Sequence, residues 1–215
     1  MHLFPYWDFN EGQLIDIFIY SNCAKTELIV NGKSLGCFEH DHFGDGKLSG
    51  RWQAEYHKGY IQAVGYDENG NELCRQTRRS FGDAARICLT PDKHELKADG
   101  EDLIFVEVSM LDRDGNPVEN DRSRVNISVD GAGRLIGLDN GDSTDYGQYK
   151  QTQRKLFGGK LIAVIAAKEY AGKITVRASS AGLCDSELEL EAVPAEKRRG
   201  VCCSFENTPS APCLE

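Results

Sequence analysis

The side chains of this sequence best suited to metal chemistry are two histidines, His40 and His42. They stand two apart in the run 37–42, and on an extended strand two such side chains share a face and could bind one ion. No third histidine or cysteine stands at a convincing distance along the chain. An exposed polar loop is therefore favoured over a metal site. We predict no metal ligands and no cofactor.

Two acidic runs resemble calcium-binding loops, one at 67–71 and one at 112–116. A calcium loop of the EF-hand type needs a bidentate glutamate at its twelfth position. Counting from Asp67 that position holds Arg78, and counting from Asp112 it holds Ser123. Both runs are rich in Asp, Asn and Gly, which favour tight turns. We therefore predict two hairpin turns.

The least ordinary segment is the polar, aromatic loop at 139–160 between two alternating apolar strands. Asp142, Tyr146, Tyr149 and Arg154 supply its charge and aromatic surface. The loop could be a surface excursion packed on itself, a docking element for another domain, or an edge that touches sugar. Docking is the interpretation we favour, and these four residues are the candidate interdomain or sugar contacts.

Exposed aromatic rings could also form a platform for carbohydrate, because ring faces suit the apolar faces of sugars. The candidates are Trp7, Trp52, Tyr60, Tyr146 and Tyr149. Core packing is the favoured use of most of them, Trp52 above all.

Short apolar strands separated by turns run through the chain, and no long stretch has helical apolar spacing. Residues 14–20 alternate, Asn31-Gly32 is a strong hairpin signal, and 60–66 with 72–78 form a second hairpin. Further strands are expected at 103–112, 125–129, 161–166, 172–179 and 186–192. We predict an all-β protein of two tandem immunoglobulin-like β-sandwich domains, 1–82 and 83–193, with a flexible tail at 194–215.

Composition excludes several classes of partner. The net charge of −9 is spread along 215 residues without a basic tract, which argues against nucleic acid. No apolar run is long enough for a membrane-spanning helix. The 8 cysteines include no Cys-x-x-Cys pair, so reduced thiols in a cytoplasmic protein are favoured, although the compartment stays open.

Ordered strings of residues across 2–193 resemble the fourth and fifth domains of bacterial β-galactosidases of glycoside hydrolase family 2. The strings that carry the resemblance are 2–9, 19–22, 27–36 and 60–66 for the fourth domain, and 89–92, 96–100, 131–135 and 139–142 with Lys150, Arg154, Lys155 and Phe157 for the fifth. The resemblance implies that the catalytic glutamates lie on a preceding (β/α)₈ barrel. Such a barrel needs about 200 residues of alternating strand and helix, which this chain lacks.

The resemblance therefore implies a non-catalytic accessory region whose partner is the catalytic barrel of the parent chain. By the same resemblance, the parent hydrolyses terminal β-linked galactosides or a related β-glycoside with retention, and it could be a homo-oligomer. We nominate no catalytic residue. The alternative is a free-standing sugar-binding or adhesin-like module of the immunoglobulin type.

Overall fold

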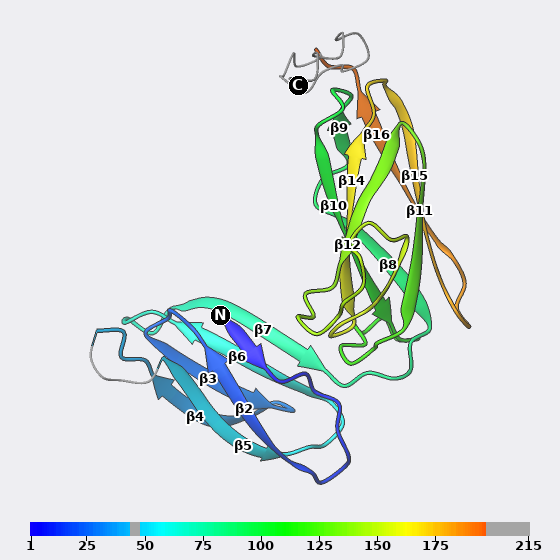
Figure 1. The fold of residues 1–215 in the computed structure, drawn as a ribbon. Helices are drawn as coiled ribbons and strands as arrows, with labels where there is room; N and C mark the ends of the chain where they lie inside the picture. The colour runs from blue at the N-terminus through cyan, green and yellow to red at the C-terminus, as the bar shows by residue number, and fades with distance from the viewer. Residues whose placement is uncertain (44–47, 197–215) are drawn as a thin grey trace, which may run out of the picture. The chain divides into compact units, whose positions relative to one another are not determined.

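The computed structural model describes residues 1–43 and 48–196. These residues form β-strands and connecting turns, without a helix, and hence without a helix that could cross a membrane. They divide into two compact units (Figure 1). The first contains Met1–Ala85 and Leu111–Asn120, and the second contains Arg86–Met110 and the residues from Asp121 on. The all-β prediction is confirmed.

The first unit is a sandwich of two sheets. Its three-stranded sheet has the order β1-β2-β5, with β1 at His2–Phe4, β2 at Leu14–Tyr20 and β5 at Ser49–Glu55. Its four-stranded sheet has the order β4-β3-β6-β7, with β3 at Lys25–Val30, β4 at Lys33–Glu39, β6 at Tyr60–Tyr66 and β7 at Glu72–Arg79. The neighbouring strands of both sheets pair antiparallel.

Alternation along the strands decides which side chains fill the first core. On β2, Ile15, Ile17 and Ile19 are buried, whereas Leu14 and Tyr20 on the opposite face are exposed. The other buried side chains of this core are Leu3, Trp7, Leu28, Tyr56, Ile61 and Ala63. Burial of this apolar surface is the main stabilisation of a small sandwich.

The second unit is a larger sandwich. One sheet has the order β12-β14-β10-β8, with β8 at Arg86–Pro91, β10 at Leu103–Leu111, β12 at Gly133–Asp139 and β14 at Lys160–Ala167. The other has the order β13-β11-β15-β16-β9, with β9 at Glu95–Lys97, β11 at Arg124–Gly131, β13 at Gln153–Lys155, β15 at Gly172–Ser180 and β16 at Ser186–Val193. Strands β9 and β16 pair in parallel.

The second core lies between these sheets, and β-branched and small residues at alternate strand positions fill it together with leucines such as Leu138 and Leu190. The inward side chains include Ile104, Val106 and Val108 of β10, Ile127 of β11, Ala163 and Ile165 of β14, and Ile174 and Val176 of β15. Both units are therefore sandwiches of alternating strands, as the sequence predicted.

The structure adds three short strands that the sequence analysis did not expect, β1, β9 and β13. It also refines the expected core. Trp52 on β5 is only partly buried and packs against the edge of the core, while Tyr56 is buried but follows the end of β5. The domain boundaries 1–82 and 83–193 stay a prediction. Most of the predicted tail, 197–215, lies outside the described residues.

Candidate functional site

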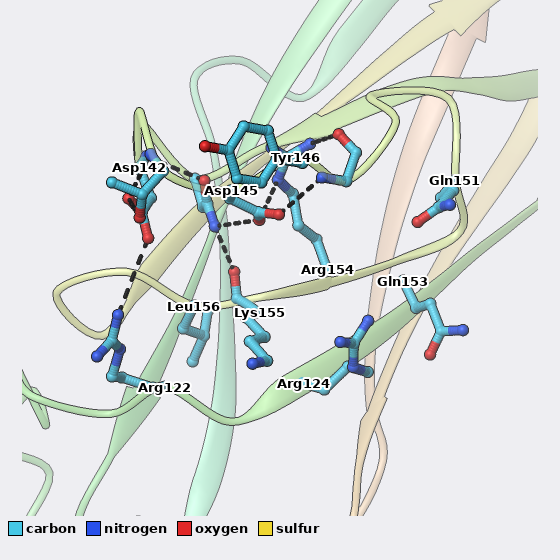
Figure 2. Close-up of a pocket in the computed structure, with 13 residues that line it drawn as sticks. Arg122, Arg124, Asp142, Asp145, Tyr146, Gln151, Gln153, Arg154, Lys155 and Leu156 are labelled. Carbon is cyan, nitrogen blue, oxygen red and sulfur yellow. Dashed lines mark hydrogen bonds and ion pairs between the residues drawn. The ribbon is translucent and has the colours of Figure 1, made fainter.

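The candidate site is the loop that leaves β12 and returns through the short strand β13 to β14 (Figure 2). β13 is held in place by pairing with β11, where Val125 lies opposite Arg154. At the other end, β12 has an irregular register between Leu135 and Gly137, and the Leu138 amide donates to the Tyr149 carbonyl at 2.7 Å. A Cβ on Gly137 would lie 2.7 Å from that carbonyl oxygen, so glycine permits this close approach.

The carboxylates of the loop bind groups of the loop itself. Asp142 accepts from both the amide and the hydroxyl of Thr144, at 2.9 and 2.7 Å. Asp145 accepts from the Gly147 amide at 2.8 Å and from the Asn140 side chain at 2.9 Å. These short-range bonds are typical of Asx turns, and they build an ordered loop without regular secondary structure.

Arg154 is the central side chain of this network. Only 4% of it is exposed, and its Nε lies 3.1 Å from a carboxylate oxygen of Asp145 (Figure 2). Its Nη1 donates to the Leu138 carbonyl at 3.0 Å. Its guanidinium also lies 4.8 Å from the centre of the Tyr149 ring, within cation–π range. Arg154 therefore ties β12, β13 and the loop together.

The two tyrosines differ from Arg154 because they face solvent. Tyr146 is 98% exposed and Tyr149 is 62% exposed. Tyr146 lines a hollow of about 490 Å³, together with charged and polar side chains that include Arg122, Asp142 and Lys155. Arg122 approaches Asp142 at 3.9 Å across this hollow (Figure 2).

The structure thus brings all four sequence-predicted residues, Asp142, Tyr146, Tyr149 and Arg154, into one loop. The rings of Tyr146 and Tyr149 are exposed to a partner, whereas the guanidinium of Arg154 and the carboxylate of Asp142 stabilise the loop. Whether any of the four touches another domain or a sugar stays a prediction. The sequence analysis did not single out Asn140 and Asp145, although their Asp/Asn-rich turn sequence was a signal.

Electrostatics argues against acid catalysis by the loop carboxylates. Hydrogen bonds from Thr144 lower the pKa of Asp142, and the Gly147 amide lowers the pKa of Asp145. A general acid at neutral pH needs a raised pKa. These two carboxylates are instead held as anions.

The two histidines pack ring on ring, with centroids 5.8 Å apart and planes 5° apart. His40 Nε2 lies 2.9 Å from the Thr26 hydroxyl, and His42 Nε2 lies 2.9 Å from the Cys23 carbonyl. Desolvation lowers the pKa of His40. Within 1–43 and 48–196, no group of three or more His, Cys, Asp or Glu side chains is arranged to hold a metal ion.

Both acidic runs are hairpin turns, as predicted. The Asp67 carboxylate accepts from the Asn69 and Asn71 amides, and the Asp112 carboxylate accepts from the Asp114 and Asn116 amides in the same way. The carboxylates therefore close the turns. Trp7, a candidate for sugar stacking, is fully buried in the first core and has no face free for a ligand.

Comparison with known proteins identifies these domains. Residues 87–189 match the family model of the glycoside hydrolase family 2 C-terminal domain 5, and residues 12–74 match a domain of unknown function, DUF4982. Residues 87–189 are a glycoside hydrolase family 2 C-terminal domain 5. The resemblance stated from the sequence is therefore confirmed.

Three relatives illustrate the match. The chain is 37% identical to beta-galactosidase BoGH2A of Bacteroides ovatus, over 89% of this chain and 22% of that protein. It is 24% identical to a beta-glucuronidase of Formosa agariphila, over 94% of this chain and 20% of that protein. The crystal structure of a beta-glycosidase from Bacteroides vulgatus matches with a TM-score of 0.80 and 30% identity, over 89% of this chain and 24% of that one. The chain therefore spans about a fifth of the length of the curated relatives.

Proposed function

We propose that this chain is a non-catalytic accessory region of a glycoside hydrolase family 2 enzyme, one that supports the catalytic barrel, the rim of the active site or the oligomer. The observation that carries the proposal is the match of nearly the whole chain to about a fifth of a beta-galactosidase. On this proposal the parent protein hydrolyses a terminal β-galactoside or a related β-glycoside with retention, and its (β/α)₈ barrel is the partner of this region.

The carboxylates of the described residues favour an accessory role over a catalytic one. Retaining hydrolysis needs two carboxyl groups about 5–5.5 Å apart across a scissile bond, one of them protonated at working pH. Asp142 and Asp145, the carboxylates beside the hollow, have lowered pKa values, and their oxygens accept hydrogen bonds from other groups of the loop. Neither is suited to give a proton to a leaving group.

The loop favours docking because its carboxylates bind groups of the loop, while the ring of Tyr146 faces solvent. Arg154 fixes the base, and Tyr146 projects from it with 98% of its surface exposed. A rigid base loses little conformational entropy when it docks, which favours affinity. Tyrosine is also enriched in the centres of protein interfaces.

The first test is activity of the 215-residue chain on chromogenic β-galactoside and β-glucuronide. We expect no turnover. Turnover that a single carboxylate substitution abolishes would overturn the accessory role.

The second test uses the full-length reading frame that encodes this region. Tyr146→Ala should lower kcat/KM or weaken subunit association, because docking removes this ring from water. Tyr170→Ala is the matched control, since Tyr170 is also exposed but lies in the turn between β14 and β15. If both variants match the parent enzyme in activity and in oligomeric state, docking through this loop is refuted.

A second candidate function is sugar binding by the region alone, favoured by the exposed Tyr146 in the lining of a polar hollow. Aromatic faces and polar groups together are typical of sugar sites. Calorimetric titration of the chain with galactose and galacto-oligosaccharides separates the two functions. Heat of binding that Tyr146→Ala removes would support the sugar site, and its absence leaves the docking role as the better account.

A further inference from the structure

Two cysteines far apart in the sequence bring their sulfur atoms together in the first unit. Cys23 and Cys74 are separated by 51 positions, and their Sγ atoms lie 3.6 Å apart. Cys23 is buried in the bend that leads from β2 into β3, and Cys74 is partly buried on β7. The pair is unrelated to the loop of the second unit.

The two thiols share the space above one glycine of the central strand β6. Cys74 lies opposite Gly65 in the β6–β7 ladder. A Cβ on Gly65 would lie 2.6 Å from the Cys23 sulfur and 2.9 Å from the Cys74 sulfur. The absence of a side chain at position 65 is therefore what allows the sulfurs to meet.

A disulfide needs the sulfurs about 2.05 Å apart, so the atoms must approach by about 1.5 Å. One partner lies in a bend and the other on β7, which is an edge strand of its sheet. Neither Cys23 nor Cys74 is therefore fixed by ladder bonds on both sides. The approach requires rotation about χ1 of at least one cysteine and a small shift of the bend.

The environment of Cys74 favours its neutral thiol in the reduced chain. Burial raises the pKa of the Cys74 thiol, and the contact with Cys23 raises it further. Glu72 acts in the same direction, while the amino group of Met1 opposes it. The thiolate is the nucleophile, so the raised pKa of Cys74 slows its reaction with an oxidant at neutral pH. The reaction becomes faster at mildly alkaline pH.

We propose that Cys23 and Cys74 form a reversible intramolecular disulfide when the chain meets a small-molecule disulfide such as oxidised glutathione. The Cys74 thiolate attacks one sulfur of glutathione disulfide, which breaks that S–S bond and releases one glutathione thiolate. The Cys23 thiolate then attacks the Cys74 sulfur and releases the second glutathione. The two cysteines lose two protons and two electrons, and one glutathione disulfide is reduced to two thiols.

The bond would join the connection between the two sheets of the first unit to the edge of its four-stranded sheet. Cys23 lies on the chain that passes from β2 in one sheet to β3 in the other. The bond would close a loop that contains β3, β4, β5 and β6. The disulfide would therefore be a redox-dependent cross-link within the first unit.

The test is incubation of the 215-residue chain with oxidised glutathione, followed by peptide mapping without reduction. All variants carry serine at the three cysteines of the C-terminal segment, so that these thiols cannot react. The replaced residues are Cys202, Cys203 and Cys213. We expect a mass loss of two hydrogen atoms and one linked peptide pair that contains Cys23 and Cys74, reversed by dithiothreitol.

Two variants make the assignment specific. Cys37→Ser removes an exposed thiol of the same unit and should leave the linked pair unchanged. Gly65→Ala places a methyl group between the sulfurs and should reduce formation of the pair at least tenfold, with far-ultraviolet circular dichroism as the check on its fold. A glutathione adduct at Cys74 that never resolves to the linked pair, or a pair formed equally well in folded Gly65→Ala, would overturn the proposal.

Discussion

Arg154 is expected to decide whether the loop of the second unit stays ordered, and Arg154→Met tests this. Methionine keeps an unbranched stem of similar length but removes the guanidinium. The Leu138 carbonyl, on a residue that is almost fully buried, then loses the donor that lies 3.0 Å away. The Asp145 carboxylate loses its ion pair at 3.1 Å, and the Tyr149 ring loses its cation.

The magnitude follows from these three losses. A buried carbonyl left without a donor costs about 1–3 kcal/mol. The Asp145 side chain is partly exposed and keeps two other donors, so its loss is about 1 kcal/mol or less. The cation–π contact adds about 0.5–1 kcal/mol. We therefore expect Arg154→Met to destabilise the second unit by about 3 kcal/mol, which lowers its unfolding temperature by about 12 °C or more.

Two measurements check this expectation. Calorimetry of the chain should show an earlier unfolding transition, and trypsin should cleave after Lys150 faster than in the unchanged chain, because local opening precedes global unfolding. Arg122→Met is the matched control. Arg122 is 71% exposed and lies 3.9 Å from Asp142, so its removal should change stability by less than about 0.5 kcal/mol.

The reasoning is refuted if Arg154→Met unfolds at the same temperature as the unchanged chain and is cleaved no faster after Lys150. It is also refuted if Arg122→Met lowers the unfolding temperature as much as Arg154→Met does. In either case the buried contacts of Arg154 would not be what orders the loop.

Three other expectations follow from single side chains. Hydrogen bonding to Glu27 raises the pKa of Tyr66 to about 12. The stability from this pair is therefore present below the ordinary tyrosine pKa near 10 and is lost as the pH rises from 10 towards 12. An ultraviolet pH titration should show a tyrosine that ionises near pH 12, and Glu27→Gln should lower the pH at which it ionises. The lowered pKa of Asp145 gives stability that is present above 3.8 and is lost as the pH falls below it. Protection of the loop amides, taken as the measured exchange rate relative to the intrinsic rate at the same pH, should therefore be full at pH 5 and reduced near pH 3. Trp7→Ala should cost about 3–5 kcal/mol by urea unfolding, because Trp7 is fully buried; a cost below 1 kcal/mol would contradict its place in the core.

Local turn chemistry made the first unit largely predictable from its sequence. Asn31 and Gly32 both adopt positive φ, 47° and 82°, as a two-residue hairpin between β3 and β4 requires. The aspartate-led turns at 67–71 and 112–116 were predicted from residue type alone and are closed by backbone amides donating to the aspartates. In each case the residues that determine the conformation are neighbours in the chain.

The short strands could not be predicted in this way. β13 has three residues, and it is a strand only because β11 lies beside it. The burial of Arg154 follows from that pairing, since Val125 lies opposite it and the loop folds back over its side chain. The sequence named Arg154 as a candidate contact, and only the long-range register shows that its guanidinium faces inward.

This inward orientation bears on how the loop could act. Arginine is a frequent anchor at interfaces, and from its type alone Arg154 would be the strongest candidate for contact with a partner. Arg154 pairs its charge with Asp145 and the Leu138 carbonyl, so a partner meets the ring of Tyr146 and the exposed charge of Arg122 instead. A partner that docks here buries the ring of Tyr146, and any salt dependence of the association should come from Arg122 and disappear in Arg122→Met, not in Arg154→Met.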